Sequence, residues 1–161
     1  MESLDINSRS NIESSRVLSN LYRKPFIMNE LFFGSIEGFL QGLRVSNIDN
    51  QVKVFAMDGI SAKNIGKLYP IDKNQTLFFK GVSFNRHSEK YVELYEKAYE
   101  WCFIQNETFQ KSLYVTMDME LIHSIGKKDP FDTILTEGEF IGQLYRLRNK
   151  YSKFLHACFG K

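Results

Sequence analysis

Two stripes of side chains along residues 35–44 form the clearest pattern in the chain. Glu37, Gln41 and Arg44 recur at i, i+4 and i+7, about 100° round a helix from an apolar stripe of the same kind. The apolar stripe, at i, i+3, i+4 and i+7, comprises Ile36, Phe39, Leu40 and Leu43. With Ser35 as the N-cap, Glu37 lies in the first turn, where free N–H groups and the helix dipole favour an ionised carboxylate. The segment predicts a helix with a packing face and a polar row; an ordinary amphipathic helix with solvated polar residues also fits the period.

Three further helices are predicted from the same period. The longest runs from a Ser88 cap to residue 104, and its stripe comprises Tyr91, Leu94, Tyr95, Ala98 and Cys102, with Trp101 at the margin. Asn106 is expected to cap a second helix that ends near Thr116. Thr136 to Glu139 fits a capping box, and the final helix continues from there to Leu155.

Shorter patterns predict the remaining elements. Residues 17–22 fit a short extended piece, and residues 26–33 fit a small hairpin. A helix beginning at Ser61 contains Gly66, which costs about 1 kcal/mol relative to Ala at mid-helix and so indicates the close approach of another helix or a ligand. Residues 123–135 show no period, and a loop of this length in a small domain is often functional.

The composition fits one domain. We expect residues 1–16 to be a loosely ordered lead-in and residues 17–161 to form the domain. Contents of 43% hydrophobic and 25% charged residues exclude a disordered chain, and no apolar run approaches the roughly 18 residues of a membrane span. The first residues lack the features of a signal peptide, so we expect a cytoplasmic protein. Two cysteines without a Cys-x-x-Cys motif, and no clustered histidines, lead us to expect no disulfide, metal or cofactor.

Charge and aromatic content leave nucleic acid open as a partner. A net charge of +2 is too small to indicate a nucleic-acid-binding protein by itself, and it does not exclude one. Aromatic residues make up 14% of the chain. Most of these rings must belong to the core, but a few could stack on a planar base.

Four blocks of sequence, in order from Val17 onward, carry a resemblance to a known family. They are Leu18-Ser19-Asn20-Leu21-Tyr22 with Pro25-Phe26, residues 35–44, Ala62-Lys63-Asn64-Ile65-Gly66-Lys67, and Leu144-Tyr145-Arg146-Leu147-Arg148. The first three resemble the Ser-Asn-Phe-Tyr, Ser/Thr-x-Glu-x-aromatic-x-Gln-Ala-x-Lys and Ala-Lys-x-x-Gly-Arg motifs of the NADAR family, also called YbiA-like proteins. The last is similar to the family's Gly-x-x-Leu-x-x-x-Arg finish. Each block alone is a weak signal, and the four together identify the resemblance.

The sequence departs from the family pattern at several positions. Arg44 and Lys67 exchange cation types relative to the family's usual Lys and Arg, and Gly42 replaces Ala. Residues 129–132, Asp-Pro-Phe-Asp, stand where the family has a Trp-Gly pair, and Glu139 stands where it has Asn. These differences bear on the identity of the substrate.

The resemblance implies a mainly α-helical fold, a single compact YbiA-like domain with a few short strands or hairpins near the N-terminus. It also implies an N-glycosidase, a hydrolase that cuts the bond between ribose C1 and a base or amine. Of the family's substrates, we expect ADP-ribose attached to guanine in DNA, so that the partners are an ADP-ribosylated nucleobase or nucleotide and DNA. A ribosylamino pyrimidine phosphate of riboflavin metabolism is an alternative substrate, and a non-catalytic ADP-ribose or NAD-binding module is an alternative function.

The expected chemistry assigns roles to particular residues. Cleavage of an N-riboside passes through an oxocarbenium-like transition state, which requires an anion near the ribose and a positioned water. Glu37 is expected to supply the anion and to orient or deprotonate the water. Glu139 and Asp132 are candidates for a second carboxylate, although capping alone explains Glu139, and His123 is assigned no role. The expected substrate-binding residues are the phosphate-binding cations Arg44, Lys63 and Lys67, the polar residues Ser19, Asn20 and Gln41, and the ring of Phe33 for the base. Phe32 offers a ring face too, and we expect one of these two phenylalanines to belong to the core.

Overall fold

The helix with the longest apolar stripe, α5 (Glu89–Gln105), forms the centre of the structure, a computed structural model that describes all 161 residues. Ser88 caps this helix by accepting a hydrogen bond from the Tyr91 N–H at 3.3 Å. Trp101, at the margin of the stripe, is 44% exposed. The stripe itself is buried throughout, at Tyr91, Leu94, Tyr95, Ala98 and Cys102. The prediction of this helix is therefore confirmed.

Eight helices and six short strands make up the fold, so the predicted mainly α-helical class is confirmed. The other helices are α1 (Glu13–Leu18), α2 (Ile36–Gly42), α3 (Ile48–Phe55), α4 (Gly59–Gly66), α6 (Glu107–Val115), α7 (Glu137–Lys150) and α8 (Ser152–Phe159). The strands are β1 (Ser3–Asp5), β2 (Phe26–Met28), β3 (Leu31–Phe33), β4 (Thr76–Phe79), β5 (Val82–Asn85) and β6 (Glu120–Ile122). No helix has the length and apolar character needed to cross a membrane.

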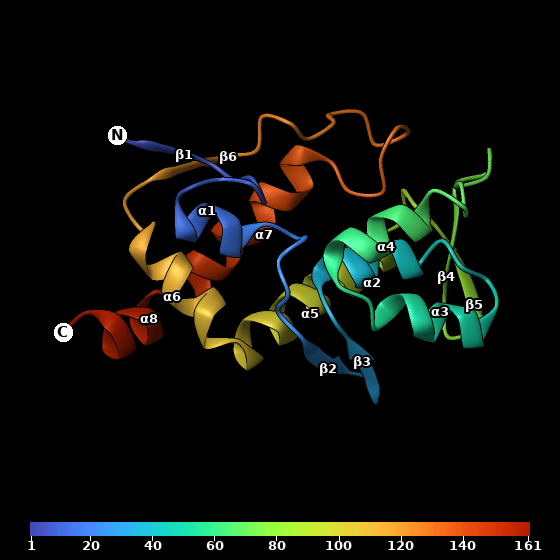
Figure 1. Cartoon of the computed structure of the whole chain (residues 1–161), viewed down its shortest axis with the longest axis horizontal. Helices are drawn as coiled ribbons and strands as arrows, with labels where there is room; N and C mark the ends of the chain where they lie inside the picture. The colour runs from blue at the N-terminus through green and yellow to red at the C-terminus, as the bar shows by residue number, and fades with distance from the viewer.

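The helices form two groups, with α5 running below and between them (Figure 1). One group contains α2, α3 and α4 together with the β4–β5 hairpin, and the other contains α1, α6, α7 and α8. The segment between β6 and α7 extends from the second group toward the first (Figure 1). The six strands form three separate sheets of two strands each.

The β2–β3 hairpin has the turn that its sequence predicts. Asn29 and Glu30 both adopt positive φ, at 51° and 64°, as a two-residue type I′ turn requires. The alternation of the strands places Phe26 and Phe33 on the buried face, where their rings stack with centroids 4.9 Å apart. Phe33 also contacts Phe55 of α3, at 4.7 Å between centroids, so the hairpin is anchored to the core.

The first residues of the chain belong to the fold, and the prediction of a loosely ordered lead-in over residues 1–16 is wrong. β1 pairs in parallel with β6, and Leu4 and Ile6 are 2% and 0% exposed in the core. Ser15 ties this strand to α1 by donating to the carbonyl oxygen of Asp5 at 2.7 Å. The extended piece predicted for residues 17–22 is also wrong in its first part, because α1 continues to Leu18.

Two predicted features of the C-terminal half need correction. The final helix does start with the predicted capping box at Thr136, but it breaks at Tyr151 into α7 and α8. Asn106 stands before α6 without capping it through its side chain. Its amide instead donates to the carbonyl oxygens of Pro25 and Cys102, at 2.9 and 2.8 Å, and so links the β2 strand to the end of α5.

A buried lysine holds the chain between α1 and β2. Lys24 is 1% exposed, and its ammonium group donates to the carbonyl oxygens of Val17 and Ser19, the latter at 2.8 Å. It also lies 5.0 Å from the centre of the Phe109 ring. Burial away from any carboxylate lowers the pKa of Lys24 from 10.5 to about 8. The charge is therefore costly in the folded protein.

Lys24→Met should change how stability depends on pH. The folded wild type binds the Lys24 proton less tightly than the unfolded chain, so its stability rises as the pH increases from about 8 to 10.5. At about 1.4 kcal/mol per pKa unit, the rise amounts to roughly 3 kcal/mol. The variant should lack this rise, which denaturant unfolding of both proteins across that pH window would measure. Parallel pH profiles for the two proteins would contradict the assignment.

Candidate functional site

Helix α2 forms where the two stripes predicted it, and it presents its polar row to a cavity. Ser35 caps the helix by accepting from the Gly38 N–H at 2.9 Å. The N–H of Glu37 donates to the carbonyl oxygen of Asn20 at 3.0 Å, so the loop after α1 closes over the start of α2. The apolar stripe of Ile36, Phe39, Leu40 and Leu43 is at most 1% exposed. Because the core fixes the apolar face of α2, the polar row of this helix must point toward the cavity.

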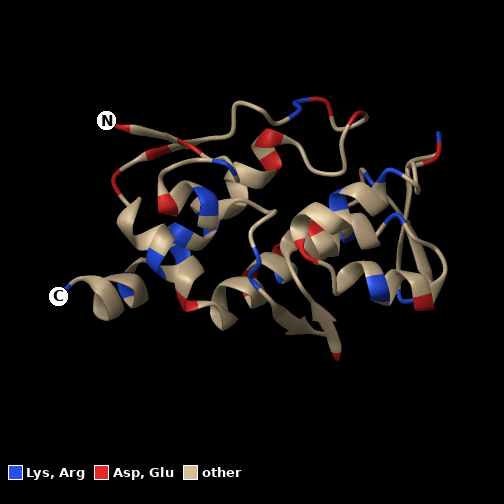
Figure 2. Cartoon of the chain, in the orientation of Figure 1, with Lys and Arg blue, Asp and Glu red and all other residues tan.

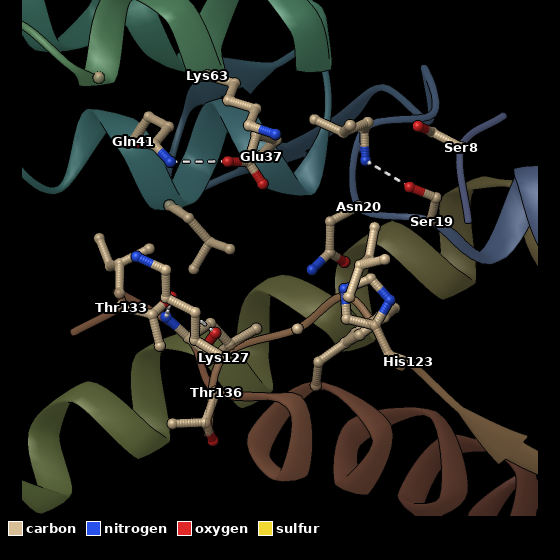
Figure 3. A pocket seen from close by; sticks show the side chains of 18 of the residues that line it. Ser8, Ser19, Asn20, Glu37, Gln41, Lys63, His123, Lys127, Thr133 and Thr136 are labelled. Atoms are coloured by element: carbon tan, nitrogen blue, oxygen red, sulfur yellow. Dashed lines mark hydrogen bonds between the residues drawn. The ribbon is translucent and has the colours of Figure 1, made fainter. Parts of the chain in front are cut away.

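The cavity lies between α2, α4, the loop after α1, the segment between β6 and α7, and the first turns of α7 (Figure 3). Its volume is about 380 Å³, within the range of about 300 to 1,000 Å³ typical of small-molecule sites. Seven of the ten residues that the sequence assigned to a site line it: Ser19, Asn20, Glu37, Gln41, Arg44, Lys63 and Lys67. The fold therefore brings together side chains from three separate sequence blocks.

Glu37 is the only carboxylate that lines the cavity. Burial raises the pKa of its carboxyl group above the ordinary 4.5, while the hydrogen bond from Gln41 and the charges of Lys63, Arg44 and His123 act in the opposite direction. Desolvation is therefore the largest influence on this carboxyl group, and it opposes the preference for the ionised form that the helix N-terminus was expected to give. A carboxylate in this setting is a stronger base than one in water.

Gln41 fixes the Glu37 carboxylate, and Gly66 makes room for Gln41. The Gln41 amide donates to Glu37 Oε1 at 2.7 Å (Figure 3). A Cβ atom at Gly66 would lie 2.0 Å from Gln41 Oε1 and 2.6 Å from Cδ. Gly66 is the last residue of α4, so its predicted mid-helix position is wrong. The close approach that this glycine predicted is confirmed, and the approaching group is the Gln41 side chain on α2.

Cationic side chains surround the single carboxylate. Arg44, Lys63, Lys67 and Lys127 all line the cavity. The Nε atom of Arg44 is buried and has no hydrogen-bond partner in the protein. Buried donors are rarely left unpaired, so this atom is suited to an acceptor oxygen of a bound ligand.

The side chain of Asn20 is held by a residue outside the cavity. Tyr99, which is 1% exposed on α5, donates to Asn20 Oδ1 at 2.7 Å. The amide nitrogen of Asn20 is then left to face the cavity, where Figure 3 shows the side chain between Glu37 and His123. Ser19 instead turns its hydroxyl back to the loop, accepting from the Leu21 N–H at 3.2 Å. Asn20 is therefore the better placed of the two to contact a ligand.

Three residues predicted for the site lie outside the cavity. Phe33 is wholly buried in the core, because the hairpin turns it toward Phe26 and leaves Phe32 exposed. Glu139 forms a bidentate ion pair with Arg86, at 2.6 and 3.1 Å, and also accepts from the Thr136 N–H in the capping box. Asp132 is exposed on the loop and does not line the cavity. These positions correct the predicted roles of Phe33 in base stacking and of the two acids in catalysis.

Several lining residues were not predicted from the sequence. Ser8 reaches the cavity because β1 pairs with β6. His123 follows β6 directly, and Lys127 lies further along the same segment. Thr133 lies on the same long segment, which the absence of a period had marked as a functional loop. Only the length of this segment could have pointed to His123, Lys127 and Thr133, and no signal in the sequence pointed to Ser8. The chain nowhere groups three or more His, Cys, Asp or Glu side chains that could hold a metal ion.

Comparison with known proteins places this geometry in a family. The model of the bacteriophage protein GP30.3 family matches residues 13–149. The 17.1 kDa protein in the Gp30-rIII intergenic region of Enterobacteria phage T4 is 42% identical over 150 residues, which cover 90% of this chain and 97% of that protein. The chain belongs to the GP30.3 family.

The fold of this GP30.3 family member is that of YbiA. The NMR structure of the E. coli protein YbiA matches with a TM-score of 0.62 at 17% identity, covering 96% of this chain and 88% of YbiA. The predicted resemblance to YbiA-like, or NADAR, proteins and the predicted YbiA-like domain are thereby confirmed.

Glu37→Gln should stabilise the GP30.3 family member at neutral pH. Because the pKa of Glu37 is raised, the folded protein binds its proton more tightly than the unfolded chain, and stability falls as the pH rises above 4.5. Gln keeps the size of the side chain and can still accept from Gln41. We expect a higher melting temperature for the variant at neutral pH, with the difference shrinking as the pH falls. A lower melting temperature at neutral pH would contradict the assignment; Glu107→Gln, an exposed first-turn change on α6, is the matched control.

Gly66→Ala should destabilise the α2–α4 contact. The added methyl group would displace Gln41 from its bond to Glu37, and such overpacking typically costs about 1–3 kcal/mol. Gly142→Ala is the control, since a Cβ atom there meets nothing within 4 Å and Ala stabilises a helix interior by about 0.5–1 kcal/mol relative to Gly. Thermal unfolding should therefore move in opposite directions for the two variants. Equal shifts would show that the Gly66 contact is loose.

Proposed function

We propose that this protein is an N-glycosidase that hydrolyses the bond between ribose C1 and nitrogen of an ADP-ribosylated nucleobase, removing ADP-ribose from guanine in DNA. The observation that carries the proposal is the single carboxylate of Glu37, a half-buried residue that lines a cavity whose other charged residues are cationic. The YbiA-like fold and the family membership support a hydrolase of this class.

The charge distribution of the cavity suits the transition state of this reaction. As the C1–N bond breaks, positive charge develops on the ribose, and an anion beside it stabilises that charge. Glu37 is the group available for this, and Gln41 holds its carboxylate in one orientation at 2.7 Å. The raised pKa of Glu37 also makes it a better base for removing a proton from the attacking water.

The cations suit the phosphate groups of a nucleotide. Arg44 can present a planar fork to phosphate oxygens, and its unpaired Nε supplies a donor that already lies out of water. Lys63 on α4 and Lys67, the residue after α4, also line the cavity, and α4 packs against α2. An ADP-ribose group bound here would place its diphosphate on this cationic side and its distal ribose near Glu37.

The distribution of charge along the chain suits both DNA and a free nucleotide as the carrier of the base. Figure 2 shows Lys and Arg interspersed with Asp and Glu along the chain. A modified base could therefore enter from DNA or as a free nucleotide. A ribosylamino pyrimidine phosphate has the same ribose C1–N bond and one phosphate, and it is the second substrate that the cavity would suit.

The decisive experiment follows base release from three substrates. ADP-ribosylated guanine in DNA, free ADP-ribosylated guanosine and a ribosylamino pyrimidine phosphate are each incubated with wild type, Glu37→Gln and Glu107→Gln. We expect wild type to release ADP-ribose from the DNA substrate and Glu37→Gln to be slower by about 10²- to 10⁴-fold, because it removes the positioned acid–base group. Glu107→Gln changes an exposed first-turn carboxylate and should match wild type.

Each other outcome selects a different conclusion. Full activity of a folded Glu37→Gln variant would remove Glu37 from the mechanism. Release from the pyrimidine substrate alone would make the protein a small-molecule N-glycosidase. Failure on all three substrates, together with calorimetric binding of ADP-ribose, would identify a non-catalytic binding module.

A further inference from the structure

His123 has a fixed orientation on the cavity wall, although the reaction described above gives it no role. Its Nδ1 atom lies 2.8 Å from the carbonyl oxygen of Ile6. Because a carbonyl oxygen only accepts, Nδ1 carries a proton and donates it. The ring packs edge-on against Phe140, with centroids 5.1 Å apart, and a Cβ atom at Gly126 would approach its Cδ2 to 2.6 Å. Three contacts from three segments therefore define the position of this ring.

The other ring nitrogen, Nε2, has no partner in the protein and is left for the cavity that His123 lines. Figure 3 shows the imidazole beside the Asn20 side chain, on a different wall of the cavity from Glu37. His123 comes from the segment after β6, whereas Glu37 comes from α2. A ligand held in the cavity can thus contact Glu37 with one part and His123 with another.

We propose that His123 is a catalytic residue that protonates the leaving base, a role that rests on the proposed glycosidase function. The water oxygen bonds to ribose C1 as Glu37 takes a proton from that water. The C1–N bond breaks, its electron pair passes to the base nitrogen, and the imidazolium Nε2–H gives that nitrogen a proton. The step leaves a ribose hydroxyl group, a neutral base, neutral His123 and protonated Glu37. Exchange of one proton with solvent at each residue restores the starting state.

A backbone acceptor and charged groups on neighbouring elements form the surroundings of His123. The carbonyl of Ile6 accepts from Nδ1 in the neutral and in the charged form of the ring. Asp5 lies on the β1 side, where it accepts from the N–H of Ser124 at 3.0 Å, and Glu37 lies on the α2 side. Lys127, on the same segment as His123, is the nearest cation along the chain that lines the cavity. Carboxylates on two elements thus interact with the ring by charge, and the cation of Lys127 lines the same cavity.

The test compares two substitutions at His123 on the substrate that wild type cleaves. In His123→Asn, the amide nitrogen can take the place of Nδ1 and keep the bond to Ile6, but nothing replaces Nε2. In His123→Gln, an amide reaches the Nε2 position and can donate a hydrogen bond without transferring a proton. We expect both variants to fold, to keep KM within a few-fold and to lose about 10²- to 10⁴-fold in kcat. His156→Asn, an exposed change on α8, is the control and should match wild type.

The pH profile separates an acid from a merely structural residue. Wild type should show a bell-shaped kcat profile, with Glu37 on the acidic limb and His123 on the basic limb, and both variants should lose the basic limb. Loss of the acidic limb, restoration of kcat by Gln, or variant rates within a few-fold of wild type would each overturn the proposal. If wild type releases no base from any substrate, the proposed function fails and this role fails with it. If wild type is active and the His123 variants are unaffected, only the role of His123 fails.

Discussion

The contact between α2 and α4 at Gly66 is the constraint on which the candidate site depends. Because Gly66 has no side chain, α4 approaches α2 closely enough for the Gln41 amide to fill the space between them. Gln41 can then donate to Glu37 at 2.7 Å, and the carboxylate is held in one orientation. The same approach brings Lys63 of α4 near enough for its charge to oppose, in part, the rise that burial causes in the pKa of Glu37. Packing of two helices therefore sets both the geometry and the charge balance of the cavity.

That charge balance is costly to the fold. Burial raises the pKa of Glu37 and lowers that of Arg44. In the folded protein Glu37 therefore binds its proton more readily than in water, and Arg44 releases its proton more readily. Their mutual attraction offsets only part of this cost, because burial remains the larger influence on each. A site that keeps charges out of water in this way is typical of a functional cavity, where local stability is given up for reactivity.

Local sequence patterns predicted α2 and its direction, but they could not predict what closes the cavity on the other side. The i, i+4, i+7 row placed Glu37 and Gln41 correctly because helical period acts over a few residues. His123 reaches the cavity only because Ser3 pairs with Glu120, 117 residues further along the chain, and no local signal records such a pairing. Phe33 was misplaced for a similar reason. The hairpin itself was predictable from its sequence. Which face of the hairpin packs on the core depends on α3, whose Phe55 contacts Phe33.

Glu139 illustrates how a residue can matter to the site without touching it. Glu139 forms an ion pair with Arg86, whose side chain is 2% exposed. Arg86 Nε also donates to the carbonyl oxygen of Thr133 at 3.1 Å. The Tyr91 hydroxyl on α5 donates to the next carbonyl, that of Ile134. The segment between β6 and α7 has no hydrophobic period that would pack it on the core, so it depends on anchors of this kind. The ion pair of Arg86 and Glu139 therefore helps to hold the part of the loop that carries Thr133 against the cavity, whether or not a ligand is bound.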